Sequence, residues 1–314
     1  MKHHTLTLTL LCLISLFLNI GCKPEKHTAS SKRVTTRNDN RNTHGYAQRL
    51  EVPCLNPDNL FNCYTTTHQG KETVTFSIEY DPTRRHSKWV AYSIDNSTAQ
   101  KHWSRKNWEN GDPFKPDPNL PKQVRISHDD HRKDKYNRGH LCASEDRVYN
   151  KEANAHTFYY SNISPQLEGF NKQGPWHDLE KQIRTWGGCG KGDAAISDTL
   201  YVVKGGTIRD GEYYDSRGQH GNIVNAYEKM NGIVVPAHYF VAIVSRKGDS
   251  FTGIAFYLDH KEYANDTSII DFAVNINRLE ELTGIDFFCN LPDKIEEITE
   301  SQCDFAQWGL SNSK

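Results

Sequence analysis

Short runs in which apolar and polar residues alternate predict β-strands over much of the chain. Val74, Phe76, Ile78 and Tyr80 are separated by single polar residues, which is the two-residue period of a strand with one buried face. Further runs rich in β-branched and aromatic residues predict strands over residues 88–94, 200–204, 233–235, 239–245 and 251–258. The polar, proline-rich stretch 95–135 predicts a long surface excursion.

Two other segments repeat their apolar residues at helical spacing. The first begins at Pro175, a residue favoured in the first turn of a helix, and ends at the glycine pair 187–188. Its apolar positions are Trp176, Leu179, Ile183 and Trp186. The second covers residues 274–283 and ends before Gly284. Because strands and helices are mixed without a repeating strand–helix–strand pattern, we predict one α+β domain with a mixed or antiparallel sheet flanked by helices.

The segment 1–22 has the features of an export signal. Lys2 supplies a positive start, residues 6–20 are apolar and uncharged, and Cys22 closes the segment. This apolar run is too short for a stable membrane anchor. We expect lipid attachment at Cys22, with ordinary secretion as the alternative, because Leu18 lies four residues before the cysteine where three is usual. In either case we expect an exported protein, either a membrane-anchored lipoprotein (periplasmic or on the cell surface) or a secreted one.

The next segment, 23–44, is rich in Lys, Arg, Ser, Thr and Asn and has almost no apolar residues. Such a composition cannot form a core, so we predict a polar disordered tether, with a frayed terminus as a nearly equal alternative. Residues 45–314 are then the folded domain, and they contain no internal repeat.

Length and charge limit the class of protein. With 314 residues, the chain is long enough to bury a sizeable core. Hydrophobic residues make up 36% of the chain and the mean hydropathy is −0.75, which indicates a soluble globular protein. The net charge of −1 excludes a strongly basic nucleic-acid binder. Any attraction to phosphate must therefore come from local clusters such as 132–133 and Arg138.

The cysteines favour disulfides. Besides Cys12 and Cys22, the chain has Cys54, Cys63, Cys142, Cys189, Cys289 and Cys303. An even number in an exported protein is typical of disulfide pairing. Proximity in sequence suggests Cys54 with Cys63 and Cys289 with Cys303, which leaves Cys142 with Cys189, although other pairings stay open. A zinc site is the competing interpretation, but the chain has no C-x-x-C pair.

The run 136–141 contains the first candidate for chemistry. His140 has a side chain that can take up a proton near neutral pH. Gly139 removes a side chain where the backbone must approach another group closely, and Arg138 supplies a fixed cation suited to a phosphate oxygen. A lone histidine beside a glycine is usually structural, and this chain has 15 histidines. The other candidates therefore decide the interpretation.

Asn171 lies in a glycine-rich segment before the predicted helix. Its neutral amide oxygen is a weak single ligand that would leave a magnesium ion largely hydrated, although asparagine is also common in turns. Glu180 and Arg184 lie one turn apart on the predicted helix. They form either an ordinary exposed pair or two groups that orient water and contact phosphate.

Several ordered motifs resemble one family. The motifs cover 137–141, 157–166, 171–176, 179–180, 201–206, 235–240 and 282–288. Together they resemble the sugar-non-specific DNA/RNA endonucleases of the ββα-metal superfamily, which include mitochondrial endonuclease G. The resemblance extends over about residues 73–292. It implies a ββα element that contains His140, Asn171 and the 176–186 helix.

The resemblance also implies roles for individual residues. His140 matches the general base, and Asn171 matches the sole direct protein ligand to Mg²⁺, with Mn²⁺ as an alternative ion. Glu180 matches the carboxylate that holds metal-bound water. Four further matches follow: Arg138 and Arg184 as nearby cations, Asn162 as an asparagine in the active-site neighbourhood, and Arg105 as the more distant transition-state arginine.

Two positions depart from the family pattern. Asn137 stands where the family usually has aspartate, which removes one negative charge beside His140. Asn171 and Trp176 are five residues apart where four is common. The cluster 128–131, with two histidines and two aspartates, is a rival metal site, although such a run is more often a solvated loop.

The sequence therefore predicts an exported Mg²⁺-dependent endonuclease that cleaves DNA and RNA with little sequence specificity. The alternative is a non-catalytic surface lipoprotein that binds nucleic acid or another polyanion. A toxin nuclease paired with an immunity protein is a further possibility, and the sequence predicts no oligomeric state.

Overall fold

The computed structural model describes residues 40, 45–131, 136–189, 195–207, 211–214, 220–223, 229–230, 232–264, 266–302 and 304–310. All of them belong to one compact unit, Val34–Lys314. The predicted signal peptide 1–22 lies outside the described residues, as does the predicted tether 23–44 apart from Asn40. Among the residues that are described, no helix is both long and apolar enough to cross a membrane.

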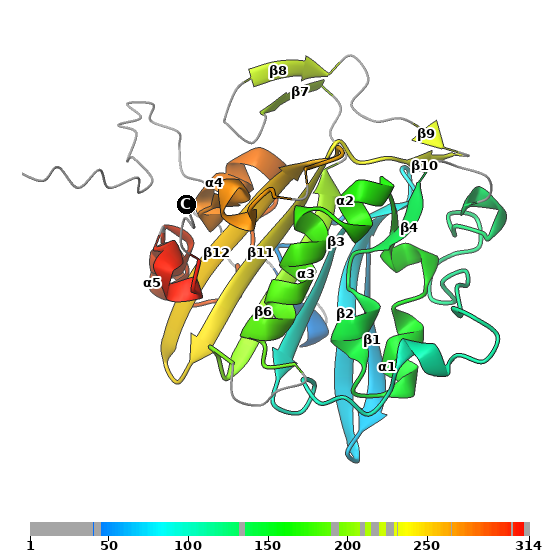
Figure 1. Cartoon of the computed structure of the whole chain (residues 1–314), viewed down its shortest axis with the longest axis horizontal. Coiled ribbons are helices and arrows are strands. Elements are labelled where there is room, and N and C mark those ends of the chain that lie inside the picture. The colour runs from blue at the N-terminus through cyan, green and yellow to red at the C-terminus, as the bar shows by residue number, and fades with distance from the viewer. Residues whose placement is uncertain are drawn as a thin grey trace, which may run out of the picture. The chain divides into compact units, whose positions relative to one another are not determined.

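A seven-stranded antiparallel sheet forms the centre of the unit (Figure 1). Its strands, in spatial order, are β1 (Leu60–His68), β2 (Lys71–Asp81), β3 (His86–Asp95), β6 (Thr199–Thr207), β11 (His238–Lys247), β12 (Ser250–Asp259) and β13 (Ala273–Val274). Every strand pair in this sheet is antiparallel. The predicted α+β class is therefore confirmed, and the sheet is antiparallel.

Shorter elements surround this sheet. Three two-stranded ribbons pair β4 (Asn137–His140) with β5 (Ile163–Gln166), β7 (Gly211–Tyr214) with β8 (His220–Ile223), and β9 (Lys229–Met230) with β10 (Ile233–Val234). The helices are α1 (Lys151–His156), α2 (Glu168–Lys172), α3 (Pro175–Trp186), α4 (Ile276–Thr283) and α5 (Asp293–Glu300). In Figure 1, α2 and α3 lie over one face of the sheet with β4 beside them.

The sheet is covered on both faces. Along β11, alternate side chains enter two different hydrophobic clusters: Tyr239, Val241 and Ile243 in the first, and Phe240, Ala242 and Val244 in the second. Neighbouring side chains of a strand point to opposite faces, so the two clusters lie on opposite sides of the sheet. Helix α3 closes the first cluster and helix α4 belongs to the second.

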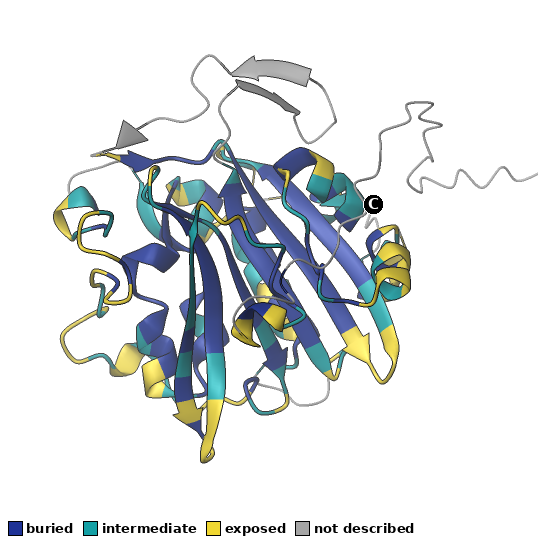
Figure 2. Ribbon diagram, turned by 180° about the vertical axis from the view of Figure 1, so that it is seen from behind, coloured by how far each residue is buried: buried dark blue, intermediate teal, exposed yellow. Residues whose placement is uncertain are grey.

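Strand β2 differs from its prediction as a half-buried strand. Phe76, Ile78 and Tyr80 are fully buried, but the polar residues between them are buried too. Figure 2 shows the strands of the central sheet in dark blue, the colour of buried residues, over most of their length. Glu79 accepts hydrogen bonds from the Asn56 backbone N–H at 2.9 Å and from the Asn59 side chain. The alternation therefore correctly separates an apolar face from a polar one. It could not show that the segment before β1 covers the polar face.

The two predicted helices are present, with ends that local chemistry explains. Helix α3 begins at Pro175 after Gly174 and ends at Gly187. Helix α4 begins at Ile276, two residues later than predicted, because the Asn275 side chain accepts a hydrogen bond from the Arg278 backbone N–H. It ends at Gly284, whose φ of 70° suits glycine.

The predicted disulfides are not present among the described residues. Cys63, Cys142, Cys189 and Cys289 are thiols, so neither the Cys54–Cys63 pair nor the Cys142–Cys189 pair forms. A side-chain hydrogen bond instead joins Cys54 to Cys289. Proximity in sequence is misleading here because Cys54 precedes β1 and its backbone N–H bonds to Asp286, whereas Cys63 lies within β1. Cys303 lies outside the described residues.

Packing of α3 on the sheet generates a stability prediction. Ile183 is fully buried in the first hydrophobic cluster, so Ile183→Ala should lower the free energy of unfolding by about 2–5 kcal/mol. Chemical denaturation measures this loss. The matched control is Lys181→Ala on the exposed side of the same helix, where the side chain is 57% exposed and the change should stay within about 0.5 kcal/mol. Equal losses in both variants would contradict the packing of this helix.

Candidate active site

The ribbon β4–β5 places His140 at the end of a strand. His140 pairs with Ile163, and Gly139 pairs with Ser164. A Cβ atom on Gly139 would lie 1.9 Å from Oε1 of Gln166, whose side chain is itself fully buried. Glycine is therefore required at this position, since any side chain would push β4 away from β5 and displace His140.

Asn162 fixes the turn that follows His140. Its side-chain oxygen accepts a hydrogen bond from the Cys142 backbone N–H at 2.8 Å, and its amide nitrogen donates to the carbonyls of Cys142 and Thr157. Asn162 is fully buried. The sequence predicts this residue in the active-site neighbourhood. In the structure its side chain does not line the pocket and instead holds the backbone after His140 through hydrogen bonds.

The imidazole of His140 lies in an apolar setting. Its ring centroid is 5.1 Å from that of Phe158 and 5.7 Å from that of Phe114. Its Nε2 atom is buried and has no hydrogen-bond partner among the described residues. Burial lowers the pKa of His140 to about 3, and the positive charges of Arg105 and Lys204 add to this effect. The ring is therefore neutral near pH 7 and able to accept a proton.

His140 opens into a pocket of about 590 Å³. The pocket is lined by Arg105, Phe114, His131, Tyr136, Asn137, Arg138, His140, Ala143, Ser144, Glu145, Asn171, Lys172, His177, Glu180 and Arg184. Of the site residues predicted from the sequence, all except Asn162 belong to this lining. Residues that are far apart in the chain thus meet at one concave surface, which is typical of a ligand site.

Asn171 reaches this pocket from α2, between the β-ribbon and α3. Its backbone N–H donates to the Leu167 carbonyl at 2.9 Å, while its side-chain amide makes no hydrogen bond with the described part of the chain. The amide oxygen is thus available as a ligand. No group of three or more His, Cys, Asp or Glu side chains that could hold a metal ion occurs among the described residues. The donor set therefore suits an ion that keeps most of its water, as Mg²⁺ does.

The rival metal cluster 128–131 is not assembled. Asp130 forms an ion pair with Arg85 at 2.7 Å, and His128 lies 2.6 Å from the hydroxyl of Tyr160 through its Nδ1 atom. His131 stacks on Tyr160 with the ring centroids 5.0 Å apart. These side chains stabilise the loop and do not converge on one point.

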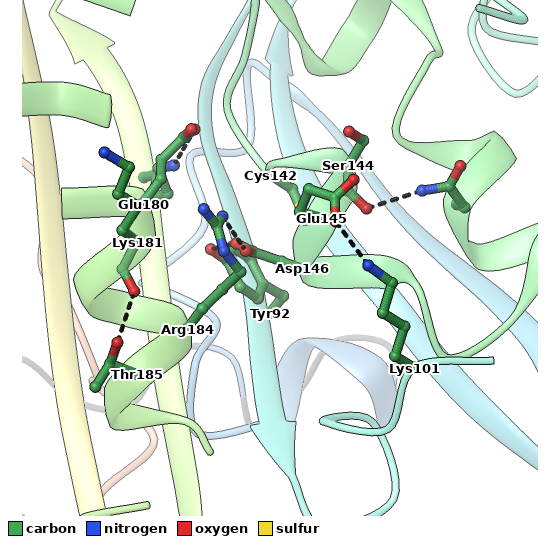
Figure 3. Close-up of polar contacts among 12 residues, drawn as sticks. Tyr92, Lys101, Cys142, Ser144, Glu145, Asp146, Glu180, Lys181, Arg184 and Thr185 are labelled. Atoms are coloured by element: carbon green, nitrogen blue, oxygen red, sulfur yellow. Dashed lines mark hydrogen bonds and ion pairs between the residues drawn. The ribbon is translucent and has the colours of Figure 1, made fainter. Parts of the chain in front are cut away.

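Glu180 and Arg184 do not bond to each other, in contrast to the simple exposed pair that their spacing allows. Glu180 bonds to the buried ammonium of Lys204 at 3.1 Å, and Arg184 bonds to the buried carboxylate of Asp146 at 3.1 Å. Figure 3 shows Arg184 on α3 pointing toward Asp146, which also accepts a hydrogen bond from Tyr92 at 2.6 Å. Glu180 and Arg184 are therefore each bonded to a buried side chain of opposite charge.

The arginines of the pocket differ in whether a carboxylate is already bonded to them. Arg105 makes a two-pronged ion pair with Asp112 and lies over the Phe158 ring. Arg138 lies over the Phe114 ring at 5.0 Å and has no carboxylate partner among the described residues. Arg138 is therefore the pocket arginine that is most available for an anionic ligand.

Sequence reasoning missed several lining residues and both buried partners. Phe114, Tyr136, Glu145, Lys172 and His177 line the pocket without having been predicted as site residues, and so does His131, which was predicted only as part of the rival metal cluster. Lys204 stands inside an apolar strand pattern, and a charged residue there is a sign that it has a buried partner. Asp146 follows the histidine motif closely, but no feature of the sequence around it indicates that it is buried and ion-paired. Its partners come from distant parts of the chain.

Comparisons with known proteins agree with this geometry. The model of the DNA/RNA non-specific endonuclease family matches residues 57–294, a stretch that includes β4, β5, α3 and all seven strands of the central sheet. The chain belongs to this family. The Nδ2 atom of Asn137, beside Arg138 at the start of β4, is buried without a hydrogen-bond partner among the described residues.

Three relatives show how far the similarity extends. The chain is 26% identical to the mitochondrial nuclease EXOG of Xenopus laevis over 230 residues, which is 72% of this chain and 60% of that protein. It is 29% identical to the mitochondrial nuclease of Saccharomyces cerevisiae over 256 residues, which is 78% of this chain and 74% of that protein. A nuclease of Nostoc is 26% identical and is covered over 76% of its length.

The chain spans about three fifths of the length of the vertebrate relatives that it matches, 60% for the frog protein and 57% for the human one. Among solved structures, endonuclease G in complex with its inhibitor is similar in fold. The TM-score is 0.61 at 22% identity, and the match covers 83% of this chain and 95% of that one. This similarity supports the antiparallel sheet with flanking helices.

The buried histidine generates a prediction on acid stability. Unfolded histidine has a pKa of about 6.5, whereas in the folded protein that of His140 is about 3. As the pH falls from about 7 to about 4.5, only the unfolded chain binds the proton, so His140 should account for a loss of about 2 kcal/mol in the free energy of unfolding. Urea denaturation of wild type and His140→Gln in EDTA measures it. The variant should lose less stability over this range, and parallel curves would contradict the buried neutral imidazole.

Proposed function

We propose that this protein is an exported, Mg²⁺-dependent endonuclease that hydrolyses phosphodiester bonds of DNA and RNA. The observation that carries the proposal is the neutral, buried His140 in a pocket shared with Asn171 and Arg138. Family membership supports the reaction class. These three side chains supply a base, an oxygen ligand and a phosphate-binding cation, which are the groups that hydrolysis of a phosphodiester requires.

His140 acts as the general base in this proposal. A neutral imidazole has one ring nitrogen that accepts a proton, and burial keeps His140 neutral at pH 7. His140 takes a proton from water, which attacks phosphorus in line with the departing 3′ oxygen. The apolar side chains of Phe114 and Phe158 hold the ring in place for this transfer.

Asn171 would hold the divalent ion directly, and Glu180 would hold it through water. When bound, such an ion offsets negative charge on the phosphate and on the departing oxygen. Glu180 is only 13% exposed, and its ion pair with Lys204 keeps the carboxylate at the pocket wall. Mg²⁺ is the favoured ion because one amide oxygen and one outer carboxylate leave most of its water in place, and Mn²⁺ is the alternative.

Arg138 would bind the phosphate that is cleaved, and Arg184 and Arg105 would add positive potential. Contacts to phosphate carry no information on sequence, so cleavage should show little sequence preference. By resemblance to the family, the products should have 5′-phosphate ends. Phosphate groups are the same in DNA and RNA, so a pocket that recognises them accepts chains with either deoxyribose or ribose. This agrees with a substrate range that includes both DNA and RNA.

Export and partners belong to the same proposal. The segment 1–22 supports export, with a lipid anchor at Cys22 as the favoured form. One solved structure of similar fold is a complex of endonuclease G with an inhibitor. By analogy, this chain would bind a protein inhibitor or immunity protein that covers the pocket.

Digestion of plasmid DNA and of RNA tests the activity. With Mg²⁺ the wild type should degrade both, and EDTA should stop the reaction. His140→Ala should lower the rate by about 100- to 10,000-fold, because the base is lost. The matched control is His102→Ala, a histidine that is exposed and outside the pocket.

The control variant should cleave like the wild type. Equal rates in wild type and His140→Ala would remove the assignment of the base. DNA that is shifted in a gel but stays intact with Mg²⁺ or Mn²⁺ would instead indicate the alternative function, a nucleic-acid binder that has lost catalysis with the change to Asn137.

A further inference from the structure

Lys204 is a buried cation beneath the pocket. It lies in β6, the middle strand of the sheet, between Val90 of β3 and Val241 of β11 in the strand register. The side chain has no exposed surface. A lysine without water needs a compensating partner, because an isolated buried ammonium costs several kcal/mol.

The partners of Lys204 lie on α3. Its Nζ atom is 3.1 Å from Oε1 of Glu180 and 4.5 Å from the centre of the Trp176 ring. Glu180 is the sole carboxylate that bonds to it in the described part of the chain. The ammonium is thus held between one carboxylate and one aromatic face, which is a well-defined position for a flexible side chain.

This arrangement also separates two charges on α3. Glu180 and Arg184 are one helical turn apart, a spacing at which opposite charges attract each other. Lys204 binds the first and Asp146 binds the second, so each points toward a different element. Without Lys204, the Glu180 carboxylate would be drawn along the helix toward Arg184, the cation one turn away.

We propose that Lys204 is a positioning residue that holds the Glu180 carboxylate in the orientation required to bind the hydrated divalent ion. This inference rests on the proposed function and deepens it. It assigns a role to a buried side chain that itself does not line the pocket. Lys204 acts through Glu180, so its effect should vanish when Glu180 is neutral.

An effect of Lys204 through its charge alone and an effect through the position of Glu180 predict opposite changes in metal binding. The ammonium repels a cation, so if only its charge mattered, Lys204→Met should bind Mn²⁺ more tightly than the wild type. If Lys204 orients Glu180, the same variant should bind Mn²⁺ more weakly, by about 10-fold or more, as is typical when a partner behind the ligands is lost. The direction of the change therefore separates the two explanations.

The experiment measures Mn²⁺ binding by calorimetry and plasmid cleavage as a function of Mg²⁺ concentration. The variants are Lys204→Met, Glu180→Gln, the double variant and Lys204→Arg. We expect weaker Mn²⁺ binding and a higher half-saturating Mg²⁺ concentration for Lys204→Met. The double variant should equal Glu180→Gln alone, because Lys204 has nothing left to orient. The control is Lys181→Met on the exposed side of α3, which should behave as the wild type.

Each outcome decides the proposal. Unchanged or tighter Mn²⁺ binding by Lys204→Met would overturn it, and so would additive effects in the double variant. If Lys204→Met fails to fold, Lys204→Arg is the deciding variant, because it keeps the charge but moves the donor atoms. Metal binding by Lys204→Arg equal to that of the wild type would then refute the positioning role. A wild type that cleaves while these predictions fail would overturn this inference alone. A wild type that neither cleaves nor binds Mn²⁺ would overturn the proposed function with it.

Discussion

The ion pair between Lys204 and Glu180 joins the central sheet to the helix that forms one wall of the pocket. Its ammonium is fully buried and its carboxylate nearly so. Attraction between buried charges offsets their loss of hydration only when the geometry is good, so such a pair seldom adds much stability. It does fix position, because either charge left alone would be costly. The pair thus ties α3 to β6 at Glu180, one helical turn from Arg184, while the apolar residues of α3 pack on the sheet.

The other wall of the pocket follows from a second constraint, the close contact between β4 and β5. Gly139 leaves room for the buried side chain of Gln166, and the Asn162 side chain bonds to the backbone N–H and carbonyl of Cys142, two residues after His140, and to the Thr157 carbonyl. These contacts carry no charge and need no water. They bring the imidazole into an apolar setting in which it stays neutral. One wall therefore depends on paired charges, and the other on close packing of backbone and side chains.

Sequence periodicity predicted the elements that are amphipathic and well capped. Helix α3 was found because an apolar stripe follows Pro175, and the stripe is the face that packs on the sheet. The resemblance to the family predicted that His140, Asn171 and Glu180 share one site, and all three line the same pocket. The hydrogen bond between Cys54 and Cys289 was missed, as were the buried ion-pair partners Lys204 and Asp146. Each of these contacts joins segments that are distant in the chain, and local patterns carry no information on which segments meet.

The pairing of charges also bears on the proposed phosphate site of a chain whose net charge is −1. Arg105 and Arg184 are bonded to Asp112 and Asp146, so their charges are largely compensated at long range. Arg138, stacked on Phe114, has no such carboxylate within the part of the chain that the structure describes. The attractive field is therefore local to the pocket and short in reach at physiological salt. A protein of this kind would bind a phosphate at the site of cleavage without binding the whole polymer tightly, which suits an enzyme that must release its products.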